Sequence, residues 1–252
     1  MTTKAEMKYA GLPGALSDYL LTRFSTATSR RLPPTGRMLE TAAGRLYLLD
    51  SDAGNNEKPC VVFTPDGPNV VAHYTRLMAL LTPRLRVIVF DMPGFGFSLP
   101  TAGYGHSLQE GAQVVLDLLS QLHIPRATLA FSCANGLYAI RAAQLQPQRI
   151  ASLMLTQTPS LPHMQAWAYR MIPLPLRVPV AGQLITWAAR RTLATRWYRS
   201  ALPTHADMGS FTQTTAQSFK QGGCFWLAWY KACCVKAACR CERRSSRQCQ
   251  CR

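Results

Sequence analysis

Between Arg86 and Leu155 the sequence alternates short apolar runs with helical patterns, and this alternation constrains the fold more than any other feature. The apolar runs RVIVF, ATLAF and IASLML are bounded by turn residues, as buried strands are. The segment Leu108–Leu122 and the segment that begins at Leu137 carry apolar residues at helical spacing. Short apolar strands alternating with helices predict a parallel sheet with helices on both faces.

Upstream segments extend this predicted sheet. Cys60–Phe63 is a short apolar run of the kind found in covered parallel strands. Met38–Thr41 and Arg45–Asp50 are expected to form a hairpin that turns at Gly44, and His73–Leu81 is expected to form a helix. The expected fold class is therefore α/β, with a doubly wound, mostly parallel sheet.

Two loops that follow predicted strands have distinctive compositions. The sequence DMPGFGFS at Asp91–Ser98 contains two glycines that allow a tight loop. The small-residue sequence SCANG at Ser132–Gly136 leads from a strand directly into a helix. A strand that enters a helix through such a turn can expose a nucleophilic side chain. Ligands collect at the carboxyl ends of strands in open α/β sheets, so we expect a site there.

These two motifs resemble those of the α/β-hydrolase superfamily, from about Thr41 to Thr156 and more loosely to about Trp229. The resemblance implies the α/β-hydrolase fold with a helical cap inserted after the core. It also implies that the Asp91–Ser98 loop is structural, so Asp91 is given no catalytic role. The expected divisions are an N-terminal helix and linker at 1–36, an α/β-hydrolase core at 37–156, a helical cap at 157–220 and a tail at 221–252.

Two neighbouring residues are candidates for the nucleophile that the resemblance implies, and the sequence leaves both open. The superfamily's spacing, counted from Ile124, places the nucleophile at Cys133. The rule that the residues two before and two after the nucleophile are small favours Ser132 instead, because Ala130 and Ala134 flank it. A cysteine at a helix N-terminus is expected to have a lowered pKa. A turn without any nucleophile is the third alternative.

The loop TPDGPN, which follows the first parallel strand, resembles the superfamily's His-Gly oxyanion loop with Asp66 in the place of the histidine. Such a loop directs a backbone N–H toward a developing oxyanion. Pro68 has no N–H, so Asn69 is the expected donor, with Gly67 as a further oxyanion or substrate contact. The N–H of Ala134 is the expected second donor. A turn without a catalytic role is the alternative.

The base and the acid that such a nucleophile needs are not identifiable in the sequence. The chain has five histidines, none of them follows a late strand, and the last is His205. The resemblance implies hydrolysis of a small ester, lactone or related molecule, and whether this chain turns over a substrate stays open at this stage. An Asp nucleophile is absent from the turn, which weighs against epoxide and haloalkane chemistry. The alternative is a catalytically silent fragment that binds a ligand or partner, or that has no independent function.

Charge and composition narrow the expected partners. The 252 residues carry a formal net charge of +16 but no nucleic-acid-binding signature, so we expect attraction to polyanions or anionic lipid rather than specific nucleic-acid binding. A small-molecule substrate is expected, without a cofactor or metal, and the oligomeric state is undetermined.

The most apolar stretch, Met171–Ala189, contains Arg177 and prolines, so no transmembrane segment is expected. With only Cys60 and Cys133 in the first 223 residues and no signal peptide, the expected location is cytoplasmic.

The C-terminal tail has a different composition, with seven cysteines in its last 29 residues. The pairs Cys239-x-Cys241 and Cys249-x-Cys251 would suit a soft metal ion. The tail begins where the superfamily has its last strands, which favours a truncated or frameshifted chain over a metal module. We therefore expect a disordered tail and an unpaired sheet edge beyond Ile150–Leu155.

Overall fold

The computed structural model describes residues 35–53, 57–101, 103–178, 180–203 and 206–222, together with Leu16 and Leu20. The helix expected at Pro13–Phe24 therefore lies outside the described residues, apart from those two leucines, which are helical. His205 and the Cys/Arg-rich sequence from residue 223 onward also lie outside them. The expectations for the tail stay predictions.

One sheet of seven strands forms the centre of the described part of the chain, in the order β1-β2-β4-β3-β6-β7 with β5 beside β2. The central and later pairs, β4 with β3, β3 with β6 and β6 with β7, are parallel, whereas β2 pairs antiparallel with its neighbours. The predicted α/β fold class is confirmed. The strands are β1 Arg37–Thr41, β2 Gly44–Asp50, β3 Cys60–Thr64, β4 Arg86–Phe90, β5 Leu99–Pro100, β6 Ala127–Ser132 and β7 Ile150–Thr156.

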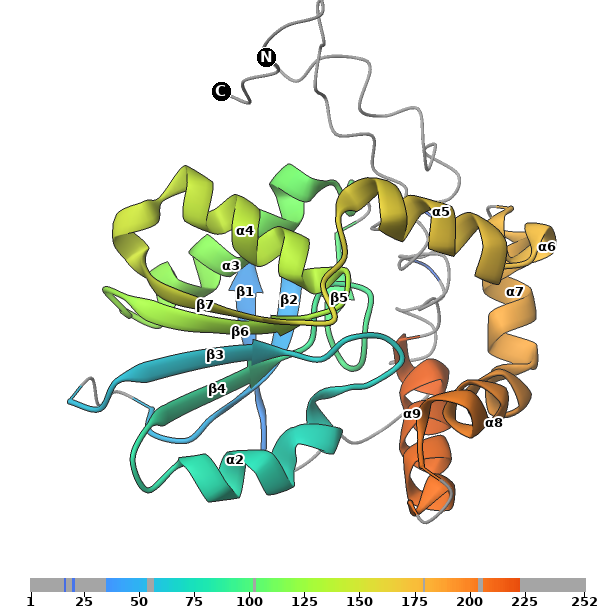
Figure 1. Cartoon of the computed structure of the whole chain (residues 1–252), viewed down its shortest axis with the longest axis horizontal. Coiled ribbons are helices and arrows are strands. Elements are labelled where there is room, and N and C mark those ends of the chain that lie inside the picture. The colour runs from blue at the N-terminus through green and yellow to red at the C-terminus, as the bar shows by residue number, and fades with distance from the viewer. Residues whose placement is uncertain are drawn as a thin grey trace, which may run out of the picture.

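Helices cover the two faces of this sheet, as Figure 1 shows. Helices α3 (Leu108–Gln121) and α4 (Asn135–Leu145) lie on one face, and α2 (Thr75–Leu81) lies on the other. Because successive side chains of a strand point to opposite faces, the central strands supply two separate cores. The larger one, under α3 and α4, includes Leu48, Ile88, Phe90, Leu129 and Phe131, and the one under α2 includes Leu49, Val61, Val87, Val89 and Ala130.

Two 3-10 turns and a capping box at the start of α3 complete the core. The 3-10 turn η2 (Val71–Tyr74) precedes α2, and η3 (Pro147–Arg149) precedes β7. At the start of α3 the Ser107 hydroxyl accepts the Glu110 N–H at 3.1 Å, and the Glu110 carboxylate accepts the Ser107 N–H at 2.9 Å. This reciprocal capping box explains why the helix begins at Leu108, where the apolar spacing predicts it.

Strand β7 differs from the prediction that it is a buried strand. Only Ile150 is buried, and every later residue of β7 is exposed, including Met154 at 57%. The reason is its position: within the described residues β7 is the last strand and pairs only with β6. The expected unpaired edge beyond this strand is therefore present in the described part of the chain.

A helical segment follows β7 and lies beside the sheet, at the right of Figure 1. It occupies the residues for which the sequence predicts a cap and extends two residues beyond them, to Gly222. Among the described residues no helix is long and apolar enough to cross a membrane. The helices are α5 Leu161–Met171, α6 Leu174–Arg177, α7 Ala181–Ala188, α8 Arg190–Ala201 and α9 Met208–Gly222.

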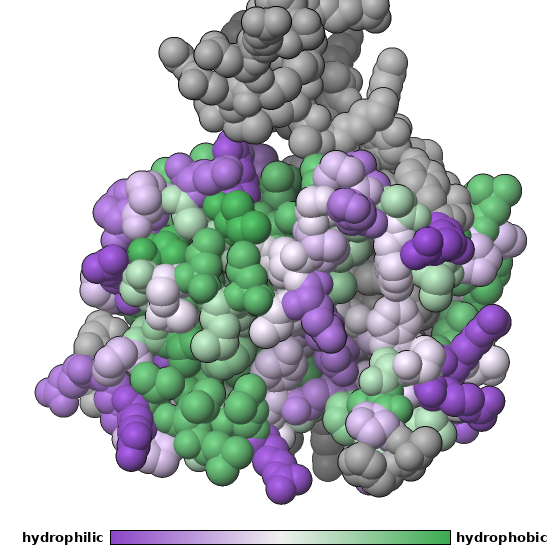
Figure 2. All heavy atoms as spheres, viewed as in Figure 1, coloured by the Kyte–Doolittle hydropathy of each residue, from purple (hydrophilic) through white to green (hydrophobic). Residues whose placement is uncertain are grey.

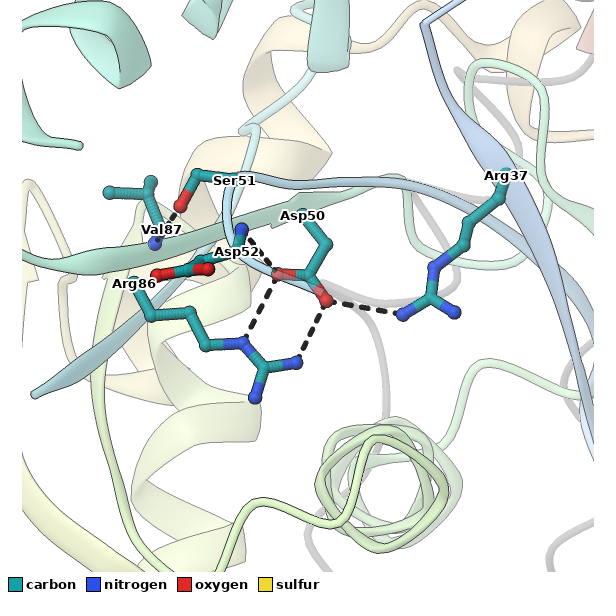
Figure 3. Close-up of polar contacts among 6 residues, drawn as sticks. All are labelled: Arg37, Asp50, Ser51, Asp52, Arg86 and Val87. Atoms are coloured by element: carbon teal, nitrogen blue, oxygen red, sulfur yellow. Dashed lines mark hydrogen bonds and ion pairs between the residues drawn. The ribbon is translucent and has the colours of Figure 1, made fainter. Parts of the chain in front are cut away.

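A buried ion pair joins β2 to β4. Figure 3 shows Arg86 and Arg37 approaching the Asp50 carboxylate from two sides. Arg86 donates from Nε to Oδ1 at 3.1 Å and from a terminal nitrogen to Oδ2 at 2.8 Å, and Arg37 donates to Oδ2 at 3.1 Å. Burial alone would raise the pKa of Asp50, but the hydrogen bonds and charge of Arg86 outweigh it and hold that pKa below its ordinary value.

This pair gives the first prediction. The substitution Arg86→Ala should lower the free energy of unfolding by about 3 kcal/mol, because it leaves a buried carboxylate with the exposed Arg37 and the Asp52 N–H as its remaining partners among the described residues. Urea denaturation measures the change. The control is Arg45→Ala, whose partner Glu40 is exposed and 3.8 Å away, and which should cost less than about 1 kcal/mol. Equal losses in the two variants would contradict the role given to the pair.

Candidate functional site

The turn between β6 and α4 contains a residue in a conformation that L-amino acids rarely adopt. Cys133 has a φ of +52° and lies between Ser132, the end of β6, and the start of α4. Its N–H donates to the Thr156 carbonyl at 2.9 Å, and its own carbonyl accepts the Gly136 N–H at 3.2 Å. The left-handed residue reverses the chain within one position, so the thiol is presented at the carboxyl end of the sheet.

Gly136 is required by the same turn. A Cβ at this position would overlap the side chain of Thr158, which follows β7. The first turn of α4 can therefore approach the end of the neighbouring strand only because residue 136 has no side chain.

Of the two candidate nucleophiles, Cys133 and not Ser132 occupies the left-handed position. Ser132 is still part of β6, and its hydroxyl hydrogen-bonds with Tyr74 of η2. The rule of small flanking residues weighed against Cys133 because Phe131 and Asn135 lie two residues before and after it. The structure accommodates both, so the rule does not describe this turn.

The two bulky flanks are accommodated in different ways. Phe131 is fully buried in the core beside Phe90, with ring centroids 6.1 Å apart. Asn135 is buried, and its amide donates to the Pro65 carbonyl at 2.7 Å. A large apolar side chain on the core face and a hydrogen-bonded one on the helix thus replace the close backbone approach that small residues would allow. The hydrogen bond also links the turn to the loop after β3.

The electrostatic environment of Cys133 is the opposite of the one expected at a helix N-terminus. Burial, and after it the negative charge of Asp66, raises the pKa of the thiol to about 11. The hydrogen bond from the Ala134 N–H to the sulfur lowers the pKa but does not offset these two effects. The expectation of a lowered pKa was therefore wrong, because it considered the helix and not the depth of the turn or the carboxylate opposite it.

The loop after β3 folds back on itself as a tight turn. The Asn69 N–H donates to the Asp66 carbonyl at 2.7 Å, and the Asn69 amide donates to the Asp66 carboxylate at 3.0 Å. The Gly67–Pro68 peptide between them is cis, as in a type VI turn. The N–H of Asn69 is thus already engaged, which corrects the expectation that it donates to an oxyanion. Gly67 is buried within the same turn.

Two helices of the segment after β7 are anchored to this loop. The Tyr198 hydroxyl of α8 lies 3.0 Å from the Asn69 side-chain oxygen, to which it donates, and 2.7 Å from the Thr215 hydroxyl of α9. Thr215 also contacts the Pro68 carbonyl at 3.3 Å. Burial raises the pKa of Tyr198, so this phenol stays protonated and remains a donor. The network fixes the helical segment relative to Asp66 and the turn around it.

An apolar cluster of the same segment packs over the cysteine. Its buried members from the helices are Met164, Ile172, Leu176 and Ala194, and they surround Ala134. Cys133 packs against this cluster, as do Trp167, Leu193 and Trp197. The thiol therefore lies between the carboxyl end of the sheet and an apolar layer, where a small apolar group could be held away from water.

None of the described histidines hydrogen-bonds with Cys133. His73 accepts the Val70 N–H through Nδ1 at 3.0 Å and stacks on Phe211, and burial lowers its pKa. His163 contacts the Ser160 hydroxyl at 2.7 Å on the exposed start of α5. The other two described histidines have left-handed backbones, His106 packed against Tyr104 and His123 following α3. No base for Cys133 is therefore identified in the described part of the chain.

The loop Asp91–Ser98 holds together elements next to the site. The buried Asp91 carboxylate accepts the Val71 N–H at 3.0 Å and the Phe97 N–H at 3.2 Å, and a Cβ at Gly96 would overlap it. Burial raises the pKa of Asp91 to about 7, although both N–H donors lower it. The carboxyl group thus joins η2 to the loop. Within the described residues no group of three His, Cys, Asp or Glu side chains could hold a metal ion.

The charge of Asp66 gives the second prediction. The substitution Asp66→Asn should speed alkylation of Cys133 by iodoacetamide roughly threefold to tenfold at pH 8, because removing the negative charge lowers the thiol pKa. In the unsubstituted protein the rate should rise about tenfold per pH unit from pH 7 to pH 9. Mass mapping of the alkylated peptides measures both.

Cys60 is the internal control, because burial, Arg86 and Asp50 set its pKa and Asp66 does not. The substitution Asp207→Asn, at an exposed position, makes the same change in charge and should leave Cys133 unaffected. Rapid alkylation of Cys133 at neutral pH would contradict its raised pKa. An equal increase in the alkylation rate of Cys60 in the Asp66→Asn variant would contradict the role given to Asp66.

Comparisons with known proteins find relatives that match part of this chain. No family model matches the chain. It is 40% identical over 118 residues to the dihydrolipoyllysine-residue acetyltransferase component of the acetoin cleaving system of Pseudomonas putida, covering 47% of this chain and 31% of that protein. It is 30% identical over 122 residues to the 2-hydroxy-6-oxo-2,4-heptadienoate hydrolase of Pseudomonas putida, covering 48% of this chain and 43% of that protein. The chain thus matches less than half of the length of these relatives.

Solved structures share the fold over a longer part of the chain. An epoxide hydrolase from Vigna radiata superposes with a TM-score of 0.63 at 14% sequence identity, covering 78% of this chain and 70% of that one. At this identity the similarity concerns the fold alone.

Proposed function

We propose that the chain, which matches part of a curated hydrolase and has the fold of α/β-hydrolases, belongs to this superfamily and cleaves a small ester or lactone through an acyl intermediate on Cys133. The observation that carries the proposal is the left-handed cysteine at a strand-to-helix turn beneath an apolar layer. The left-handed backbone places the half-buried Cys133 side chain at the end of β6, and a substrate carbonyl has to reach it beneath the apolar layer.

The first step forms a thioester. The Cys133 sulfur attacks the carbonyl carbon and the carbonyl oxygen becomes an oxyanion. The Ala134 N–H, which donates to the sulfur in the free protein, then shifts to this oxyanion. Collapse of this intermediate breaks the ester bond and releases the alcohol, which takes up the proton lost by the thiol. Gly67, in the buried turn after β3, is the remaining candidate of that loop for a substrate contact, since the Asn69 N–H is engaged. Water then cleaves the thioester.

The local electrostatics make the proposed reaction slow. A thiol with a pKa of about 11 is ionised in about one molecule in a thousand at pH 8. Since no described histidine contacts Cys133, nothing in the described part of the chain accelerates removal of the thiol proton or activation of water. We therefore expect acylation to be detectable and subsequent turnover to be weak.

The substrate class follows from the surroundings of the sulfur. Cys133 packs against an apolar cluster that includes Met164, Ile172 and Leu176, which favours an apolar acyl group of small size. The relatives named as hydrolases carry the names of small organic molecules, which supports a small-molecule substrate. A cysteine rather than an aspartate at the turn favours acyl transfer over the epoxide chemistry of the structural neighbours.

A catalytically silent binding protein is the second candidate. The raised pKa of Cys133 and the lack of a described histidine beside it favour this alternative. Such a protein would hold an apolar ligand in the same place without forming a bond to it.

The third prediction separates the two candidates. With p-nitrophenyl acetate at about pH 9, the protein should release about one p-nitrophenolate per chain in a burst, followed by slow turnover, because the thiolate acylates faster than the thioester hydrolyses. Mass spectrometry should find the acetyl group on Cys133. The substitution Cys133→Ala should abolish the burst, whereas Ser132→Ala, the matched control at the neighbouring position, should retain it.

A burst that survives Cys133→Ala, or an acetyl group on Ser132, would refute the proposed role of the cysteine. No acetylation at any position would favour the binding protein.

A further inference from the structure

The end of the helical segment farthest from the sheet carries several exposed apolar side chains. We call this the α6–α7 surface, and it extends from the last residue of α5 through α6 and α7. Leu174 is 68% exposed and Leu184 is 51% exposed. Figure 2 shows apolar residues at the right edge of the molecule, where α6 and α7 lie in Figure 1. The exposed members are Met171, Leu174, Val178, Val180, Leu184, Ile185 and Trp187.

These side chains are not needed for the internal packing of the segment. The same segment already buries Ile172 and Leu176, which belong to the cluster against which Cys133 packs, and the polar Thr186. The segment therefore has two apolar sides, one packed inward and one directed to the surroundings. An outward apolar set of this size marks an interaction surface rather than incomplete folding.

The backbone beneath the α6–α7 surface is well defined. The Gly182 N–H donates to the Val178 carbonyl at 2.8 Å, and the Leu184 N–H donates to the Val180 carbonyl at 3.0 Å. The Thr186 hydroxyl donates to the Gly182 carbonyl at 2.7 Å. A Cβ at Gly182 would overlap the carbonyl of Leu176, so α7 packs directly on α6. These contacts link α6 to α7 and stabilise the described backbone on either side of residue 179.

The charge around this surface has one sign. No Asp or Glu occurs in the sequence between Asp117 and Asp207. The Arg190 guanidinium lies 5.4 Å from the centre of the Trp187 ring and donates to the Trp187 carbonyl. Arginines on both sides of the surface and along α8 are Arg170, Arg191, Arg196 and Arg199, all of them exposed.

We propose that the α6–α7 surface docks on an anionic lipid bilayer. Short amphipathic helices with Trp and Leu on one side and arginines beside them lie in the interface, with the apolar side chains below the headgroups. The arginines are attracted to anionic headgroups, and Trp is favoured at the boundary between headgroup and hydrocarbon. An acidic polymer such as RNA would match the charge but leave the apolar side chains exposed. The proposal does not depend on the chemistry of Cys133.

The fourth prediction tests this with the full chain and sedimented vesicles. The chain should bind vesicles of phosphatidylcholine and phosphatidylglycerol in about equal amounts more tightly than vesicles of phosphatidylcholine alone, and less tightly at high salt. The double substitution Leu184→Glu and Trp187→Glu should weaken binding to the anionic vesicles at least about tenfold, because it removes two apolar contacts and adds two repelled charges. Hydrogen exchange at residues 178–188 should slow on addition of the anionic vesicles.

Leu80→Glu is the matched control, because Leu80 is 73% exposed on α2, away from this surface, and it should change binding little. Equal binding by the double variant and the unsubstituted chain would assign the attraction to basic residues elsewhere and overturn the proposal. The proposal would also be overturned if single-stranded RNA displaced the chain from the vesicles and bound the double variant and the unsubstituted chain equally well. A dimer in solution that the double substitution dissociates, without a change in vesicle binding, would assign the surface to a second copy instead.

Discussion

The left-handed backbone at Cys133 is the constraint on which the arrangement around the site depends. A non-glycine residue in this conformation costs about 1–3 kcal/mol, so its neighbours must hold it there. They do so from two directions: the Thr156 carbonyl of β7 accepts the Cys133 N–H, and Asn135 binds the loop after β3. The close approach at Gly136 completes the restraint. The turn after β6 is therefore held against the ends of both β3 and β7.

The rest of the sheet keeps these strand ends in register. At the opposite end, the buried pair of Asp50 and Arg86 joins β2 to β4, which pairs in parallel with β3. Near the site, the Asp91 carboxylate binds the η2 turn and its own loop, so the elements that flank Asp66 cannot move independently. The Tyr198 hydroxyl then ties the helical segment to Asn69. Polar contacts, each buried or partly buried, thus position an otherwise apolar site.

Burial gives the site its shape and at the same time limits its reactivity. The same packing that covers Cys133 with apolar side chains raises the pKa of its thiol, and the Asp66 carboxylate adds to the effect. A single Ala134 N–H cannot reverse this. The outward side of the covering helices carries exposed apolar side chains as well. The arginines around it give this segment a positive charge without any Asp or Glu between Asp117 and Asp207.

The sequence by itself determined the order of strands and helices from β1 to β7, apart from the two-residue strand β5 and the 3-10 turns η2 and η3. Apolar runs and helical spacing are local signals that the packed sheet then uses directly. It also identified the turn at 132–136 and the loop at 64–69 as the places to examine. Only the tertiary structure shows that Cys133 and not Ser132 occupies the left-handed position, since that φ angle depends on contacts with β7 and the β3 loop, which are distant in sequence. The engaged N–H of Asn69, the exposed β7 and the raised pKa of Cys133 likewise depend on which groups lie nearby in space, and no local pattern encodes that.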